Sequence, residues 1–258
     1  MDVNLAGKVA VITGGTAGIG EACVQAFLQE GCKVAVCGRS QEKLERLKAA
    51  MKAQGWEILT CQADAANRQE ISAFAQTVFD SYGKLDIWVN NAGISLKAKL
   101  MDMTEADWDT ILAVNLKSVF LGAQVAARYM RQGKGGVILN ASSYAAVIPS
   151  AGGGAYAASK AAISSLTRTL AAELAPYNIR VNGYIPGVID TQMNSRRLAE
   201  QPAETLGQIA LNRAGAANEV AAGIVFLASD AASYITGTDL EISGGKFAVQ
   251  IPGDPWQW

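Results

Sequence analysis

Two residues near the middle of the chain have the types and the spacing to move a proton. Tyr156 and Lys160 stand four residues apart, and residues at that spacing share one face of a helix. The chain contains no histidine, the side chain whose unperturbed pKa lies closest to neutrality. A free phenol has a pKa of about 10, but a nearby ammonium favours the phenolate and lowers that pKa. The pair therefore predicts a tyrosine acid/base tuned by a lysine. Taken alone, it could also be a half-buried tyrosine beside a solvated lysine.

A glycine-rich segment has the composition to hold phosphate groups. The sequence TGGTAGIG, residues 13–20, follows an apolar run and opens a segment of helical period; its spaced glycines are Gly14, Gly18 and Gly20. Glycine lets backbone N–H groups approach an anion at a helix N-terminus, as in dinucleotide-binding folds. We therefore expect a dinucleotide pyrophosphate at this turn. A tight turn that needs glycine only for its positive φ is the alternative.

Apolar runs alternate with segments of helical period along the whole chain. We expect strands at residues 8–12, 33–37, 57–61, 85–90, 136–142, 179–185 and 239–243, and helices at 18–30, 40–54, 67–81, 104–130, 155–174, 192–199 and 218–227. Nearly continuous apolar strands that alternate with helices indicate a parallel sheet covered on both faces. No linker or repeat divides the chain. The prediction is an α/β protein with one Rossmann domain over residues 1–258, a doubly wound parallel sheet of about seven strands with helices on both faces.

Six short motifs, in this order along nearly the whole chain, resemble those of the short-chain dehydrogenase/reductase family. They are TGxxxGxG at residues 13–20, NNAG at 90–93, Asn115, Ser143, Tyr156-x-x-x-Lys160 and PGVIDT at 186–191. The resemblance implies an oxidoreductase that interconverts a ketone and a secondary alcohol by hydride transfer. Among family members, the chain looks like 3-oxoacyl-(acyl-carrier-protein) reductases and like polyol, sugar and steroid dehydrogenases.

The resemblance assigns a role to each of four catalytic residues. Tyr156 exchanges a proton with the substrate oxygen, and Lys160 holds the hydroxyls of the nicotinamide ribose. Ser143 hydrogen-bonds the same substrate oxygen and stabilises developing alkoxide charge. Asn115 helps to hold a water that links the lysine to solvent. Asparagine is also mildly unfavourable inside a helix unless its side chain makes a local contact, so this position already calls for a reason.

The end of the second strand favours NADP as the cofactor. The position that would carry an acidic residue for the adenosine ribose is Gly38, followed by Arg39 and Ser40. An arginine can pair bidentately with a 2′-phosphate. NAD remains possible, because Ala17 stands where many NADP-dependent relatives have a second basic residue. The cofactor-binding residues implied by the resemblance are Gly14, Thr16, Gly18, Ile19, Gly20, Arg39, Ser40, Asp64, Asn91, Ala92, Gly93, Tyr156, Lys160, Pro186, Gly187, Ile189 and Thr191, with Asp64 placed at the adenine amino group.

Substrate selection is expected from a loop at about residues 187–215 and from the segment between Ser143 and Tyr156. The expected substrate-binding residues are Ser95, Ser143, Tyr144, Tyr156, Val188 and Met193. They suggest a cleft without an obvious fixed charge. Arg196 or Arg197 could meet an anionic substrate, although a solvated helix face is the preferred interpretation. The alternatives are a 3-oxoacyl-thioester reductase, an NAD-dependent polyol, sugar or steroid dehydrogenase, and, least favoured, a non-catalytic cofactor-binding sensor.

Composition argues against several other classes of protein. The formal net charge is −1, from 22 basic and 23 acidic residues without a basic block, so we expect no nucleic-acid partner. The longest uncharged run, residues 135–159, contains polar residues, a proline and a triple glycine, so no membrane span is expected. The four cysteines form no CxxC pair and the chain lacks histidine, so we expect no metal site. Reduced, buried thiols suit a cytoplasmic protein.

The C-terminal tail, at about residues 247–258, carries two tryptophans, Trp256 and Trp258. Exposed tryptophans at a chain end call for a contact surface. The hypothesis is that the tail docks on a neighbouring subunit, close to the mouth of that subunit's active site. The family resemblance implies a homotetramer.

Overall fold

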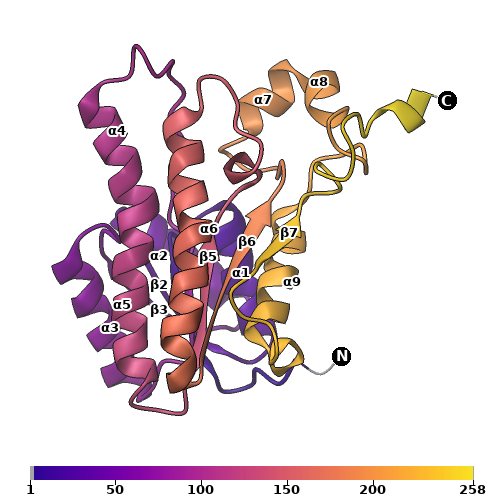
Figure 1. Cartoon of the computed structure of the whole chain (residues 1–258). Coiled ribbons are helices and arrows are strands. Elements are labelled where there is room, and N and C mark those ends of the chain that lie inside the picture. Colours follow the sequence, from indigo (N-terminus) through magenta and orange to yellow (C-terminus); the bar gives the residue numbers. More distant parts are fainter. Residues whose placement is uncertain (1–2, 258) are drawn as a thin grey trace.

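The computed structural model describes residues 3–257, and these form one layered α/β fold around a seven-stranded parallel sheet (Figure 1). The strands are β1 (Val9–Thr13), β2 (Lys33–Gly38), β3 (Ile58–Gln62), β4 (Ile87–Asn90), β5 (Gly136–Ala141), β6 (Ile179–Pro186) and β7 (Asp239–Ile242). Their order in the sheet is β3-β2-β1-β4-β5-β6-β7. The predicted fold class is therefore confirmed. The chain order reverses between β1 and β4, which is where open α/β sheets bind their ligands.

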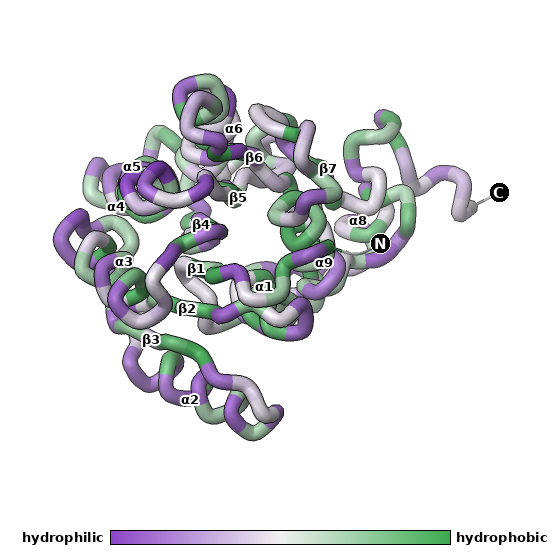
Figure 2. The backbone as a smooth tube through the Cα atoms, turned by 90° about the horizontal axis from the view of Figure 1, so that it is seen from below, coloured by the Kyte–Doolittle hydropathy of each residue, from purple (hydrophilic) through white to green (hydrophobic). Residues whose placement is uncertain are grey.

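Helices cover both faces of the sheet (Figures 1 and 2). One face carries α1 (Gly18–Gln29), α2 (Gln41–Ala53) and α9 (Ala217–Ala228), and the other carries α3 (Arg68–Tyr82), α4 (Glu105–Leu112), α5 (Ser118–Met130) and α6 (Gly154–Leu174). Along β1, Ala10 and Ile12 pack into the core with α1 and α9, whereas Val9 and Val11 pack into the core with α3 and α5. Alternate residues of a strand point to opposite faces, so a strand between two helical layers must be apolar throughout.

The expected helix at residues 104–130 is continuous, but it contains a wider turn in its middle. α4 passes into a π-helical turn, η1 (Ala113–Lys117), which passes into α5. Such turns are rare, occur mostly inside α-helices and often lie at functional sites. Its central residue, Asn115, is fully buried.

The same run, Glu105–Met130, is the one helix among the described residues that is long and apolar enough to cross a membrane. Just over half of its apolar window, 56%, is buried inside this fold. A core helix of a soluble protein passes the same test of length and composition, so this run is weak support for a membrane span.

Two short helices stand above the carboxyl ends of the strands, and the tail lies beside them (Figure 1). They are α7 (Ser195–Glu200) and α8 (Pro202–Leu206). The indole Nε1 of Trp256 donates a hydrogen bond to the carbonyl oxygen of Ala210 at 2.8 Å, and Gly253 packs on the backbone of Gly207. The tail therefore contacts the substrate loop of its own chain. Its docking on a neighbouring subunit stays a prediction, and Trp258 lies outside the described residues.

A chain of buried polar side chains crosses the sheet beneath α5 and α6. Trp88 Nε1 donates to Asn90 Oδ1 at 2.7 Å, and Asn90 Nδ2 donates to Asn140 Oδ1 at 2.9 Å. Asn140 Nδ2 then donates to Thr167 Oγ1 at 3.0 Å. All four side chains are at most 2% exposed, so each amide depends on these partners for its hydrogen bonds.

We expect Gly122→Ala to break this network. A Cβ at Gly122 would lie 2.7 Å from Trp88 Nε1 and closer still to Asn90 Oδ1. Overpacking together with loss of a buried hydrogen bond should lower the free energy of unfolding by about 2–3 kcal/mol. The measurement is the urea midpoint at fixed protein concentration. Gly133→Ala is the matched control, because the nearest atom to its Cβ would be Met130 O at 3.6 Å. Equal midpoints for the two variants would contradict the prediction.

Candidate active site

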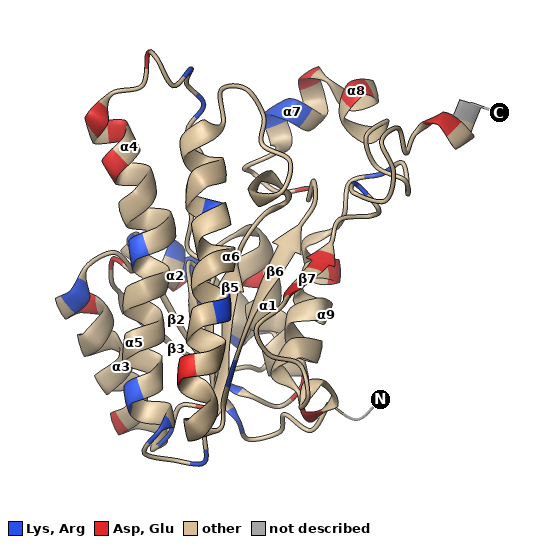
Figure 3. Ribbon diagram, viewed as in Figure 1, with Lys and Arg blue, Asp and Glu red and all other residues tan. Residues whose placement is uncertain are grey.

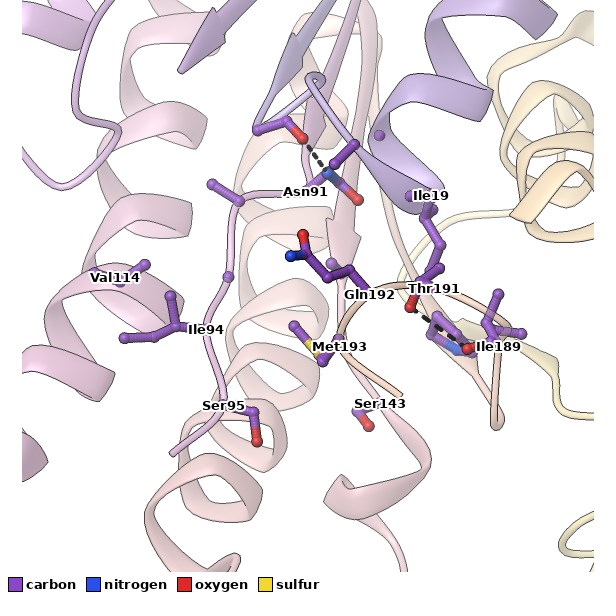
Figure 4. A pocket seen from close by; sticks show the side chains of 18 of the residues that line it. Ile19, Asn91, Ile94, Ser95, Val114, Ser143, Ile189, Thr191, Gln192 and Met193 are labelled. Carbon is purple, nitrogen blue, oxygen red and sulfur yellow. Dashed lines mark hydrogen bonds between the residues drawn. The ribbon is translucent and has the colours of Figure 1, made fainter. Parts of the chain in front are cut away.

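A cavity of about 560 Å³ runs along the carboxyl ends of the strands, from the ends of β2 and β3 past β1 and β4 to β5 and β6. Figure 4 shows Asn91 and Ile19 near one end of this space, and Ile94, Ser95, Ser143 and Met193 around the other.

The loop between β1 and α1 is shaped to leave backbone N–H groups facing the cavity. Gly14 has a φ of 65°, and a Cβ there would lie 2.9 Å from Ala92 Cα. The Asn91 amide fixes the loop from below by donating to Gly14 O at 3.0 Å. α1 begins after Ala17, and no side chain caps its first N–H groups. These donors and the positive end of the helix dipole fit a dinucleotide pyrophosphate.

Two basic residues line the cavity where it passes the end of β2, at the end expected to hold the nucleotide. Arg39 is exposed at the cavity wall, and none of the described residues accepts a hydrogen bond from its guanidinium group. Lys43, in the first turn of α2, lines the same wall. Ser40 caps α2 by accepting from Lys43 N at 3.3 Å, which fixes where this helix begins. Lys43 was not among the residues predicted from the sequence. Its position three residues after the helix cap Ser40 is the one feature of the sequence that could have indicated it.

The catalytic candidates come together at the far end of the cavity. α6 carries Tyr156 and Lys160, and Ser143 follows β5. Lys160 Nζ donates to Ala141 O at 2.7 Å and lies 5.6 Å from the centroid of the Tyr156 ring. Ser143 and Lys160 are 5% and 4% exposed. The arrangement can therefore offer a hydroxyl, a phenol and an ammonium to one small ligand group.

Burial governs the protonation of this pair. It raises the pKa of Tyr156, the Ser143 hydroxyl partly opposes that rise, and Tyr144 adds to it. Burial also lowers the pKa of Lys160 to about 8. The expected fall in the phenol pKa is thus wrong for the protein without ligands, because burial outweighs the opposing effect of the Ser143 hydroxyl on the pKa of Tyr156. At neutral pH the Tyr156 side chain is therefore the neutral phenol, which can donate a proton.

Asn115 acts from behind the cavity wall. Its Oδ1 accepts from Ile94 N at 2.8 Å, and its Nδ2 donates to Ile94 O at 3.0 Å and to Ser159 Oγ at 3.0 Å. Ser159 Oγ donates in turn to Tyr156 O at 2.6 Å. The asparagine therefore ties the loop after β4 to α6. Its partners are distant in sequence, so the local contact expected for an asparagine inside a helix is not what holds it.

The structure brings together nearly all of the residues predicted from the sequence. Every expected cofactor-binding residue lines the cavity, as do the expected substrate-binding residues other than Val188. Val188 is 1% exposed, its carbonyl accepts from Gly215 N at 2.9 Å, and it lines a separate, smaller cavity. Lining residues that were not predicted from the sequence include Ile94, Lys97, Val114, Ser150 and Gln192.

The two arginines of α7 differ in their surroundings. The Arg196 side chain is 86% exposed and pairs with Glu200 at 2.8 Å, as expected of a solvated helix face. Arg197 instead lines the cavity, donating from Nη1 to Tyr144 OH at 2.9 Å and from Nε to Thr205 Oγ1 at 3.2 Å. The prediction that this arginine lies on a solvated helix face was therefore wrong for Arg197. Consecutive helical residues point about 100° apart, so one of two neighbours can face inward.

Comparison with known proteins agrees with this geometry. Residues 8–202 match the family model described as short chain dehydrogenase. A 3-oxoacyl-[acyl-carrier-protein] reductase of Thermotoga maritima is 41% identical over 94% of this chain and 99% of that protein. An NAD-dependent glycerol dehydrogenase of Listeria innocua is 40% identical over 95% of both chains.

A solved structure gives the same answer for the fold. A short-chain type dehydrogenase/reductase from Mycobacterium marinum superposes with a TM-score of 0.91 at 35% identity, covering 96% of this chain and 98% of that one. Because sequence and structure match over nearly the full length, the chain belongs to the short-chain dehydrogenase/reductase family of NAD(P)-dependent oxidoreductases.

Proposed function

We propose that the protein interconverts a small ketone and its secondary alcohol with NADP(H). The observation that carries the proposal is that Ser143, Tyr156 and Lys160 open onto the same cavity as the glycine loop of α1. When bound, the nicotinamide ring supplies or accepts the hydride. The chain's own residues then have to bind the nucleotide, hold the carbonyl and move one proton.

The protonation state of Tyr156 supports reduction of the carbonyl as the favoured direction of the reaction. The Tyr156 phenol carries its proton at neutral pH, so it can donate to a substrate oxygen as negative charge develops there. Ser143 can hydrogen-bond the same oxygen and stabilise that charge. The Lys160 ammonium has donors beyond the one given to Ala141, and these can hold ribose hydroxyls and restore the proton.

Charge at the nucleotide end supports NADP over NAD. Arg39 and Lys43 both line the wall after β2, and Gly38 stands where a carboxylate would repel a 2′-phosphate. The Listeria innocua relative is NAD-dependent by name, so both cofactors occur among similar chains. Asp64, at the end of β3, is assigned to the adenine.

A 3-oxoacyl thioester is the second candidate for the substrate, supported by the similarity to the Thermotoga maritima reductase. A polyol, a sugar or a steroid is a further alternative. We further propose a cytoplasmic homotetramer that packs through α4, α5, α6 and β7. Partly exposed Trp108 on α4 and Phe120 on α5 support such an interface.

Tyr156→Phe should abolish turnover while sparing cofactor binding. Removing a general acid typically costs 10²- to 10⁴-fold in rate, whereas the ring and its packing remain. The measurement is initial-rate NADPH oxidation with diketones, ketoses, cyclic ketones, steroids and 3-oxoacyl thioesters, beside NADPH binding by fluorescence. Tyr177→Phe is the matched control, because Tyr177 is 49% exposed beyond the end of α6. A Tyr156→Phe enzyme that keeps its rate would overturn the assignment.

Arg39→Gln should shift cofactor preference. We expect the KM for NADPH to rise about 10- to 100-fold, since a charge-assisted contact is lost, while the KM for NADH stays nearly constant. Arg46→Gln is the control, because Arg46 is exposed on α2, the helix that begins just after Arg39, and pairs with Glu42. If both cofactors weaken equally in Arg39→Gln, the arginine has no role in recognising the 2′-phosphate.

The pH dependence of cofactor capture should report Lys160. Its ammonium form predominates below its lowered pKa of about 8 and is lost as the pH rises through that value. Because kcat/KM reports groups of the free enzyme, kcat/KM for NADPH should fall about tenfold per pH unit above pH 8. Ionisation of Tyr156 should not cause a further fall in kcat/KM just above pH 8, because burial raises its pKa. A profile that stays level to pH 10 would show that the ammonium form is not required.

A further inference from the structure

Three side chains form what we call the basic cluster. Arg197 on α7 and Tyr144 after β5 line the substrate end of the cavity, and Lys246 after β7 lies against the Tyr144 ring. Arg197 Nη1 donates to Tyr144 OH at 2.9 Å, and Lys246 Nζ lies 5.0 Å from the centroid of the Tyr144 ring. Lys246 is 9% exposed and its Nζ donates to Gln208 Oε1 at 2.8 Å. Figure 3 shows the basic colour of α7 above the carboxyl ends of the strands.

The two cations of the cluster have no acidic partner. Within residues 3–257, every ion pair within 4 Å involves other basic residues. Burial, and then the nearby positive charge of Arg197, lower the pKa of Lys246. Two like charges held together in a partly desolvated place are costly until an anion offsets them.

The distribution of charged residues along the cavity also favours an anionic ligand at the substrate end. Asp64 is the only acidic side chain among the described residues that line it, and it lies at the end of β3, at the nucleotide end. Around the substrate end, the lining carries Lys97, Lys160 and Arg197. An anionic substrate entering this space would meet no repelling carboxylate.

Hydrogen-bond donors are left over for such an anion. Arg197 Nε is engaged with Thr205 and Nη1 with Tyr144, while no described residue accepts from Nη2. Tyr144 OH accepts the bond from Arg197, so its own proton is available. Tyr144 follows Ser143 directly and raises the pKa of Tyr156, so it stands close to the position of the reacting carbonyl.

We propose that Arg197 and Tyr144, supported by the charge of Lys246, bind an anionic group of the substrate, which makes the preferred substrate a short oxo acid or hydroxy acid. This inference rests on the proposed ketone reduction. The group is a compact oxyanion, a carboxylate or a sulfonate, a few bonds from the carbonyl. Arg197 fixed at Nε and Nη1 would present its remaining edge to that group, and Tyr144 would donate a second hydrogen bond.

The competing explanation gives Arg197 only a structural role, tying α7 to the segment of Tyr144. That role and substrate recognition predict different things for a matched pair of substrates. Acetoacetate and methyl acetoacetate share the ketone and differ in the negative charge. A structural arginine would affect both equally, whereas a recognition residue would affect mainly the acid.

The test compares kcat/KM for acetoacetate and for methyl acetoacetate, in wild type, Arg197→Met and Arg196→Met, with 2-oxopropane-1-sulfonate as a second anion. We expect wild type to prefer an anion over the ester at least tenfold. Arg197→Met should lower kcat/KM for that anion about 30- to 100-fold, mainly through KM. Arg196→Met, exposed and paired with Glu200, should leave the ratio of acid to ester unchanged. An unchanged ratio in Arg197→Met, with ester turnover retained, overturns the inference and leaves the proposed function standing.

A binding measurement separates this inference from failure of the reaction itself. Propane-1-sulfonate and butyrate cannot be reduced, and their binding to the NADP⁺-saturated protein can be followed by calorimetry. We expect binding by wild type and Arg196→Met, and at least tenfold weaker binding by Tyr144→Phe and Arg197→Met. If no ketone is turned over but this pattern holds, the anion site stands and the proposed function fails. If neither anion binds to wild type, the inference is overturned.

Discussion

The side-chain amide of Asn115 is the contact on which the catalytic end of the molecule depends. It satisfies both the N–H and the carbonyl of Ile94 and also reaches Ser159, whose hydroxyl bonds the carbonyl of Tyr156. One buried amide thereby sets the distance between the loop after β4 and the catalytic helix. A regular α-helix would hold this side chain at a different angle, and the π-helical turn η1 supplies the extra residue that turns it inward.

Keeping Lys160 and Lys246 positively charged lowers the stability of the protein when no ligand is bound. Burial opposes the ammonium of Lys160, and Lys246 is opposed by burial and by Arg197. Active sites commonly keep such groups because the same desolvation strengthens their pull on a bound ligand. A negatively charged substrate would relieve part of this cost. Binding and folding stability should therefore be strongly linked in this protein.

Much of the architecture could be predicted because it follows from local pattern. A strand such as β1, apolar from Val9 to Ile12 and buried along its whole length, can only lie between two helical layers. The loop before α1 needs glycine where its backbone touches Ala92. The pairing of Tyr156 with Lys160 could be predicted for the same reason, because a four-residue spacing fixes a shared helix face.

The rest depends on contacts between segments far apart in the chain, which no local period encodes. The π-helical turn at Asn115 is fixed by Ile94 and Ser159, distant in sequence. Arg197 turns inward because Tyr144, 53 residues earlier, accepts its hydrogen bond. Val188 lies outside the cavity, buried in the segment that the isolated β-bridge between Ile189 and Gly215 holds in place. The raised pKa of Tyr156 likewise follows from its burial, which the spacing of residues does not reveal.

The pairing at Gly215 has a consequence for how this enzyme could diversify. Val188 O accepts from Gly215 N at 2.9 Å and Asp190 N donates to Gly215 O at 2.8 Å, so the segment between them is a loop closed at its base. For a flexible loop, doubling the length costs only about 0.6 kcal/mol in closure entropy. Insertions, deletions and exchanges of α7 and α8 can therefore accumulate with little disturbance to the sheet. New specificities can arise in this segment while Tyr156 and Lys160 on α6, and Ser143 after β5, stay where they are.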